Sequence, residues 1–179
     1  MAVTNIRTGL EGYAQLEINR AAFLKNGLVV SQLPLSDEFT AAVPCENGMW
    51  VDADKANGEI KLPSANTKVF GIVYTTEKEY NDGFYGLKQF HQVEGDYPRV
   101  GILHQGDTFT TSCVKLDTAT YDTDAKIKTA IASGLYVNYS TDGRPQLATT
   151  GSGTCYGKVI ALTTMPNGEK AIKYNIVVA

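Results

Sequence analysis

The residues best suited to chemistry are two histidines and a glutamate near the middle of the chain, His91, Glu94 and His104. Two imidazoles and one carboxylate are the ligands with which non-haem iron proteins hold a metal in a facial arrangement. The rest of a ligand set is missing from this segment, which is rich in loop-forming residues. The simpler interpretation is a polar loop or hairpin, so we expect no catalytic residue, no metal and no cofactor.

Other chemistry-bearing motifs are absent from the sequence. It contains no Gly-x-Ser-x-Gly elbow and no glycine-rich phosphate-binding loop. The segment Gly151-Ser152-Gly153 precedes an apolar strand pattern and predicts a hairpin loop. Three cysteines, Cys45, Cys113 and Cys155, are odd in number and widely spaced, which argues against a disulfide framework or a zinc site. We expect three reduced, buried thiols and therefore folding in a reducing cytoplasm.

Composition excludes further classes of function. The 179 residues carry a net charge of −3, with 43% hydrophobic and 20% charged residues, an ordinary globular balance. Because there is no basic stripe with interleaved aromatic residues, we expect no nucleic-acid binding. Because no apolar run approaches the roughly 20 residues of a membrane-spanning helix, we expect no membrane contact. The first residues also lack the apolar core of a signal peptide.

Short strands with turns between them dominate the chain after residue 36. The apolar and β-branched runs are 68–75, 100–103, 109–116, 135–139, 158–164 and 171–178. Asn-Gly, Asp-Gly and Gly-Asp pairs separate them, and such pairs suit tight hairpins. One segment, 124–133, predicts a short helix that ends at Gly134. The pattern predicts a mainly β fold, a small β-barrel or sandwich.

The N-terminal part, residues 1–35, is predicted to be an arm and connector, and 36–179 the β domain. Leu10, Tyr13 and Leu16 recur at helical spacing, and no strand alternation is present. Apolar residues of this arm are the candidates for binding a partner: Ile6, Leu10, Tyr13, Leu16, Phe23 and Leu24. The alternative is that the stretch packs as a short amphipathic helix on its own domain.

An internal repeat is present at about 40–76 and 129–164, with 77–128 as an insertion between the copies. The matched positions are Gly48 with Gly134, Trp50 with Tyr136, Val51 with Val137, Gly58 with Gly143, Leu62 with Leu147, and Gly71 with Gly157. Each copy predicts a strand, a glycine turn, a second strand, a loop and a buried strand. We expect the two copies to form equivalent units, with Trp50 and Tyr136 in related environments.

This repeat resembles the small β domains of tailed-bacteriophage head decoration proteins, also called capsid cement proteins. The shared pattern is a glycine, an aromatic residue, a valine and an Asp or Asn, then a glycine turn and a second glycine in an apolar strand. The resemblance covers 129–178 best and 40–76 less well, and this chain departs from it by carrying the pattern twice. It implies a β-tulip-like or barrel-like fold and trimers bound at three-fold positions of an icosahedral shell.

The sequence therefore predicts a virion structural protein and not an enzyme. Its partner would be the major capsid protein, it would form a homo-oligomer, with a trimer favoured, and it would lie on the capsid surface. Alternatives are a head-fibre base, a tail-associated β-protein, a carbohydrate-binding module, or a cupin-like metal enzyme. The order of His91 and Glu94 is similar to the first cupin motif, but Val93 stands where that motif has a second histidine. A cluster of aromatic residues would contact a partner or form a satellite core: Tyr80, Phe84, Tyr85, Phe90 and Tyr97.

Overall fold

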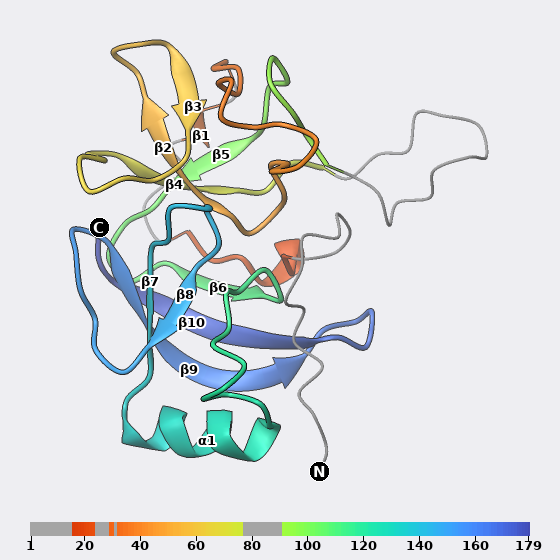
Figure 1. The fold of residues 1–179 in the computed structure, drawn as a ribbon, viewed down its shortest axis with the longest axis vertical. Coiled ribbons are helices and arrows are strands. Elements are labelled where there is room, and N and C mark those ends of the chain that lie inside the picture. Colours follow the sequence, from red (N-terminus) through yellow and green to blue (C-terminus); the bar gives the residue numbers. More distant parts are fainter. Residues whose placement is uncertain (1–15, 24–28, 31, 77–90) are drawn as a thin grey trace.

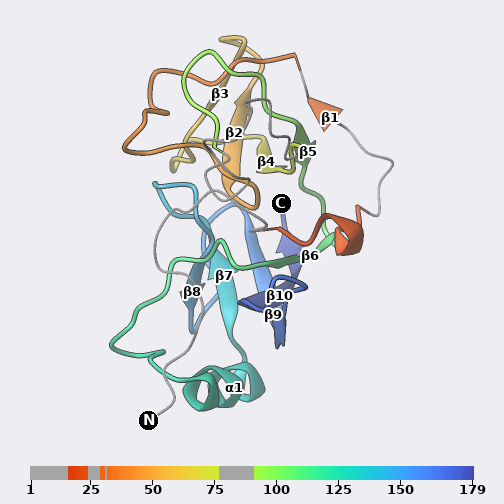
Figure 2. The same ribbon diagram turned by 90° about the vertical axis from the view of Figure 1, so that its right-hand side faces the viewer.

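Two antiparallel sheets of five strands each make up most of the protein in the computed structural model (Figure 1). The structure describes residues 16–23, 29–30, 32–76 and 91–179. One sheet lies above the other along the longest axis, and both views show the same stacking (Figures 1 and 2). The predicted mainly β fold is confirmed. In the described residues the strands form a sandwich-like domain and do not close a continuous barrel.

Each sheet consists of five consecutive strands in the same order. The first contains β1 (Val29–Val30), β2 (Trp50–Asp54), β3 (Glu59–Lys61), β4 (Phe70–Val73) and β5 (Val100–Ile102), ordered β1-β5-β4-β2-β3. The second contains β6 (Thr108–Thr111), β7 (Tyr136–Asn138), β8 (Gln146–Ala148), β9 (Tyr156–Thr164) and β10 (Lys170–Val178), ordered β6-β10-β9-β7-β8. The described chain is thus two successive copies of one five-stranded unit, here called unit 1 (29–102) and unit 2 (108–178).

The register of the strands shows that the sequence repeat is also a structural repeat. Val51 lies opposite Gly71 in unit 1, and Val137 lies opposite Gly157 in unit 2. The matched turn glycines adopt the same left-handed conformation, with φ of 74° at Gly58 and 79° at Gly143. Asn-Gly and Asp-Gly turns need such positive φ values, which other residues adopt only with strain. The prediction of equivalent strand–turn–strand–strand units is therefore confirmed for the backbone.

The structural repeat is longer than the sequence predicted. The described part of the predicted insertion contains β5, β6 and the start of the helix α1, and both of its strands belong to the sheets. Similarly, β1 belongs to the first sheet although it lies in the predicted arm. β1 has only two residues, too few to show a period of its own. The runs 100–103 and 109–116 were recognised as strands, but no sequence match assigned them to the repeat.

The helix α1 (Asp124–Ser133) agrees with the predicted helix 124–133. It begins where the Thr123 hydroxyl accepts a hydrogen bond from the Lys126 backbone N–H, and it ends at Gly134 with φ of 97°. Ile127 is its buried residue, and the helix packs along β9 of the second sheet (Figure 1). In the described residues, no helix has the length and apolar character needed to cross a membrane.

The described N-terminal residues form an added strand segment and not the predicted helix. Leu16 pairs with Thr111 and Ala22 with Thr108, both antiparallel, and only Ile18–Arg20 forms a short 3-10 turn. The Glu17 N–H donates to the Thr110 carbonyl over 2.9 Å. This segment lies beside the outer edge of β6 in both views (Figures 1 and 2). The helix indicated by the residue spacing is not formed here, because a short isolated helix is only marginally stable. The free edge of β6 instead supplies backbone hydrogen-bond partners to an extended segment.

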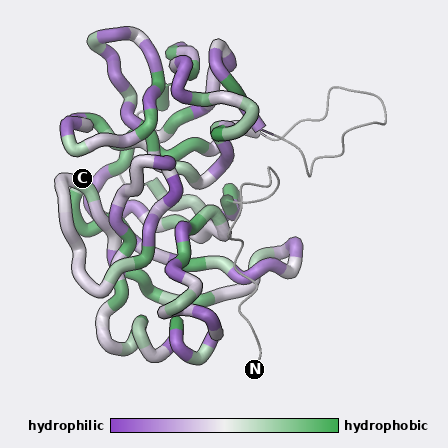
Figure 3. The backbone as a smooth tube through the Cα atoms, in the orientation of Figure 1, coloured by the Kyte–Doolittle hydropathy of each residue, from purple (hydrophilic) through white to green (hydrophobic). Residues whose placement is uncertain are grey.

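The interior contains two hydrophobic clusters. The smaller lies mainly in unit 1, with Val51, Val73, Val100 and Phe39, and also contains Cys113 of unit 2. The larger fills unit 2 and also takes in Trp50, Phe70 and Ile72 from unit 1. Hydrophilic residues concentrate in the turns and in the hairpin that joins β9 to β10 (Figure 3). The second cluster therefore joins the two units through a shared core.

Candidate interaction surfaces

The three residues considered as candidate metal ligands do not come together. His91 and Glu94 are exposed in the loop before β5, whereas His104 is half-buried, with its Nδ1 4.0 Å from the Asp107 carboxylate. The same carboxylate accepts a hydrogen bond from the His104 backbone N–H, which is a local turn. Among the described residues, which include these three, no group of His, Cys, Asp and Glu side chains is arranged to hold a metal ion.

The three cysteines are free and buried, as predicted. Burial raises the pKa of the Cys155 thiol to about 12. Burial and the nearby charge of Glu46 raise the pKa of Cys45 and Cys113 further above the ordinary thiol value. The thiolate is the nucleophilic and metal-binding form of cysteine, so these side chains act as apolar packing groups at neutral pH.

Two of the predicted partner-binding residues lie against the protein itself. Leu16 is only 3% exposed and belongs to the larger hydrophobic cluster. The Phe23 ring lies 5.3 Å from that of Tyr74 in unit 1 and 5.1 Å from that of Phe109 in unit 2. The Phe23 ring therefore joins the two units, and the role of both residues in binding a partner stays a prediction. The intramolecular packing that stood as the alternative holds for this part, in an extended and not a helical form.

The remaining candidates of the arm, Ile6, Leu10, Tyr13 and Leu24, lie outside the described residues, and their role stays a prediction. Four of the clustered aromatic residues, Tyr80, Phe84, Tyr85 and Phe90, also lie outside them. Tyr97 is described and is 61% exposed in the loop before β5.

The contact between the units joins two different surfaces. Trp50, Phe70 and Ile72 lie on one side of the first sheet, because Trp50 pairs with Ile72 and Asp52 with Phe70. Val51 and Val73 face the other side and belong to the interior of unit 1. The side with Trp50 is pressed against unit 2, and we call it the packed face of unit 1.

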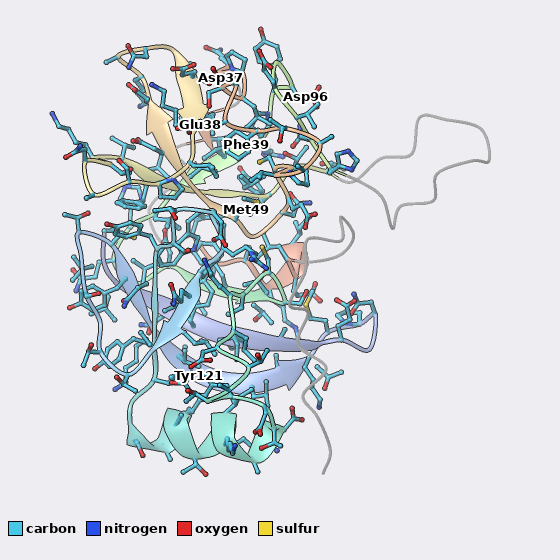
Figure 4. All side chains as sticks on the ribbon, in the orientation of Figure 1. Asp37, Glu38, Phe39, Met49, Asp96 and Tyr121 are labelled. Carbon is cyan, nitrogen blue, oxygen red and sulfur yellow. The ribbon has the colours of Figure 1, made fainter. Side chains whose placement is uncertain are left out.

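Aromatic side chains and one turn of unit 2 contact this packed face. The Trp50 indole Nε1–H donates to the Tyr174 hydroxyl over 2.9 Å, and both side chains are fully buried. The Phe70 ring lies 5.4 Å from the Tyr139 ring, and the Trp50 backbone N–H donates to the Gly143 carbonyl over 2.7 Å. Met49 lies at the same junction, between the two sheets (Figure 4). We call this part of unit 2, formed by Phe109, Tyr139, Gly143 and Tyr174, the receiving end of unit 2.

The equivalent face of unit 2 is on the surface. The paired registers of β2–β4 and β7–β9 place Tyr136, Tyr156 and Lys158 of unit 2 at the positions of Trp50, Phe70 and Ile72. Two residues further along the chain, Ile160 has the position of Tyr74. Ile160 is 49% exposed, Lys158 is exposed, and the half-buried rings of Tyr136 and Tyr156 lie 6.1 Å apart. We call these four residues the exposed face of unit 2.

Trp50 and Tyr136 therefore share a backbone position but not an environment, and the prediction of related environments is wrong for the side chains. The physical reason is that the two units pack head to tail. In such an arrangement one face is covered and its equivalent is not. Sequence reasoning also missed the exposed face itself, although the aligned segments 70–74 and 156–160 carried the signal.

A hollow lies beside β1 in unit 1. It is lined by Val29, Val30, Gln32, Leu33 and Lys55. Its wall combines apolar and polar side chains, and Val29 is 37% exposed. Protein-family models, curated proteins and solved structures were each compared with the chain, and none matches.

Proposed function

We propose that this protein is a virion structural protein that binds the major capsid protein and stabilises an icosahedral shell, as decoration proteins do. The observation that supports the proposal most is the glycine-marked β unit and its closing strand. Tyr136 and Val137 follow Gly134, Gly157 lies opposite Val137, and β10 completes the sheet beside β9. These are the residues through which the chain resembles the decoration proteins.

The proposed task is adhesion over a symmetric lattice. Each contact between one copy and the shell can be modest, because copies bound to several capsid subunits at once gain from a high effective concentration. A homo-oligomer, with a trimer favoured, would bridge neighbouring capsid subunits and hold them against the pressure of packaged DNA. The three buried free thiols support folding in the reducing cytoplasm of a host before assembly at the capsid surface.

The arm is the proposed contact with the shell, and the structure sharpens the test of it. Residues 16–23 pair with β6 and join the two units, so a deletion must end before Leu16. We therefore suggest removing residues 1–15 and measuring co-sedimentation with undecorated shells. The melting temperature of the truncated protein serves as the control for folding.

The expected result is an unchanged melting temperature and a loss of binding to shells. Full binding by the folded truncated protein would show that the arm is not the contact. If the intact protein itself does not bind shells but binds isolated tails, head fibres or glycans, the proposed function is wrong and one of the alternative classes is right.

A further inference from the structure

Each unit contains a hollow at the same place in its fold, where its second strand ends beside the loop that leads to its fourth strand. In unit 1 the hollow is lined by β2 and the loop before β4, and in unit 2 by β7, β8 and the loop before β9. Asp52 is the counterpart of Asn138, since Asp52 lies opposite Phe70 and Asn138 lies opposite Tyr156. The repeated backbone therefore forms both hollows, and the side chains decide what each can bind.

The hollow of unit 2 has a volume of about 510 Å³, within the roughly 300–1,000 Å³ of small-molecule sites. We call it the unit 2 hollow, and its principal lining side chains are Lys115, Asn138, Tyr139, Thr141, Gln146 and Ser152. None of the described residues that line it is acidic. Its one ammonium group is already paired, because the Lys115 Nζ lies 3.0 Å from the Asp142 carboxylate. A matching ligand is therefore uncharged and rich in hydrogen-bonding groups.

Hydrogen bonds of the protein itself hold part of this lining in place. The Asn138 amide donates to the Thr150 carbonyl over 3.1 Å and to the Ser152 hydroxyl over 3.0 Å, and its oxygen accepts from the Ser152 N–H over 3.0 Å. Because the Ser152 oxygen accepts from Asn138, its own O–H is available to donate to a ligand. Lys115 similarly donates to the Ser140 hydroxyl over 3.2 Å. Such preorganised groups lose little conformational freedom when a ligand binds.

Two further side chains of the unit 2 hollow are available to a ligand. Gln146 and Thr141 are exposed, and within the described part of the chain neither side chain has a hydrogen-bond partner. A side-chain amide offers a donor and an acceptor in one plane, which matches two neighbouring hydroxyl groups of a sugar ring. The half-buried Tyr139 ring, held 5.4 Å from the Phe70 ring, supplies an apolar wall for the C–H face of such a ring.

The equivalent hollow of unit 1 has different chemistry. Ala53 stands at the position of Tyr139, so the aromatic wall is missing. Four charged side chains line it: Asp52, Asp54, Lys55 and Lys68. Because removing water from charged groups is costly, this hollow disfavours a neutral ligand. Unit 1 is thus a control within the same molecule.

We propose that the unit 2 hollow binds a neutral saccharide. The Gln146 amide and the hydroxyls of Thr141 and Ser152 bind the sugar hydroxyl groups, and the Tyr139 ring packs against the apolar face of the sugar. The site contains no residue of the arm, so a copy that is attached to a shell through its arm would still present it. This inference goes beyond the proposed function and does not depend on it, because sugar binding is a property of the isolated protein.

The test is a saturation-transfer NMR titration of the purified full chain with glucose, galactose, mannose, maltose and lactose as probes. We expect binding of at least one of these sugars. Gln146→Ala should weaken it about tenfold, because the amide can make two hydrogen bonds to a sugar. Thr141→Ala removes one hydroxyl and should weaken it by a smaller factor. Lys55→Ala makes the matched truncation at the equivalent position of unit 1 and should bind as the natural chain does.

Three results would overturn the proposal. The first is that none of the neutral sugars binds the natural chain. The second is that Gln146→Ala binds as the natural chain does, or that Lys55→Ala loses as much affinity, since either places the sugar outside the unit 2 hollow. The third is that galacturonic acid or glucosamine binds more tightly than every neutral probe, which contradicts an uncharged ligand. Gln146 and Thr141 are exposed, so both variants should fold, and their melting temperatures check this. Their binding to shells should be unchanged, so a failure here leaves the proposed function standing.

Discussion

Replacing Tyr174 with Phe removes the acceptor of the one side-chain hydrogen bond described between the Trp50 indole and unit 2. The Trp50 Nε1–H donates to the Tyr174 hydroxyl over 2.9 Å, and both residues are fully buried. The ring centroids lie 5.9 Å apart, so the phenyl ring of the variant keeps the aromatic contact. The change therefore isolates the hydrogen bond at the junction of the two units.

The expected loss follows from leaving a buried donor without its acceptor. An unsatisfied buried N–H costs about 1–3 kcal/mol, more than the ~1 kcal/mol that a hydrogen bond contributes net. For a protein of this size, each kcal/mol lowers the melting temperature by about 2–4 °C. In a Trp50→Phe background the donor is already absent, so the same replacement should cost less by ~1 kcal/mol or more.

The assay is urea unfolding of the four proteins of this double-mutant cycle, with melting curves as a second measurement. Tyr97→Phe is the matched control, since Tyr97 is 61% exposed. We expect the control to remain within about 0.5 kcal/mol of the natural protein. If Tyr174→Phe costs no more than Tyr97→Phe, or the cycle shows no coupling, the hydrogen bond does not hold the units together.

Three further predictions concern single sites. Burial raises the pKa of all three thiols, so above the ordinary thiol pKa of 9.0 the unfolded chain loses protons that the folded protein keeps. The free energy of unfolding is therefore constant with respect to these thiols below pH 9.0, and above it falls by up to ~1.4 kcal/mol per pH unit for each thiol. Urea unfolding at pH 8 and 10 checks this, and an equal loss in Cys155→Ala would contradict it for that thiol. Thr123→Ala removes the cap of α1 and should cost about 1 kcal/mol, whereas Thr123→Ser should restore it. Gly157→Ala places a Cβ 2.8 Å from the Asn175 carbonyl oxygen and should lower the melting temperature clearly; an unchanged value would show that β9 and β10 can separate.

Local signals in the sequence were sufficient for the features that depend on a few neighbouring residues. The helix 124–133 has its capping threonine before it and its glycine after it, so its ends follow from backbone chemistry alone. The apolar run 171–178 likewise identified β10, in which Ile172, Tyr174 and Ile176 share one face and are buried, whereas Val178 at its end is 38% exposed. Wide spacing and odd number correctly identified the cysteines as free thiols.

Signals weakened where an element was short or where its partner lay far along the chain. β1 has two residues and β5 has three, too few to show alternation, and both were left out of the predicted repeat. Leu10, Tyr13 and Leu16 gave a helical spacing, yet Leu16 pairs with Thr111. Pairing with the edge of β6 determines the extended conformation of residues 16–23, and the sequence of that segment alone does not reveal that a distant strand edge lies beside it.

The sequence by itself determined the central part of the repeated unit, with its turn glycines and the strands β2 to β4 and β7 to β9. Only the tertiary structure decided which face of each unit is covered. Trp50 is fully buried and Ile160, on the equivalent face of unit 2, is 49% exposed, although the two strand pairs around them have the same register. Periodicity reports the two faces of a strand, whereas burial depends on what packs against each face. Head-to-tail packing covers this face in unit 1 and leaves the same face of unit 2 at the surface.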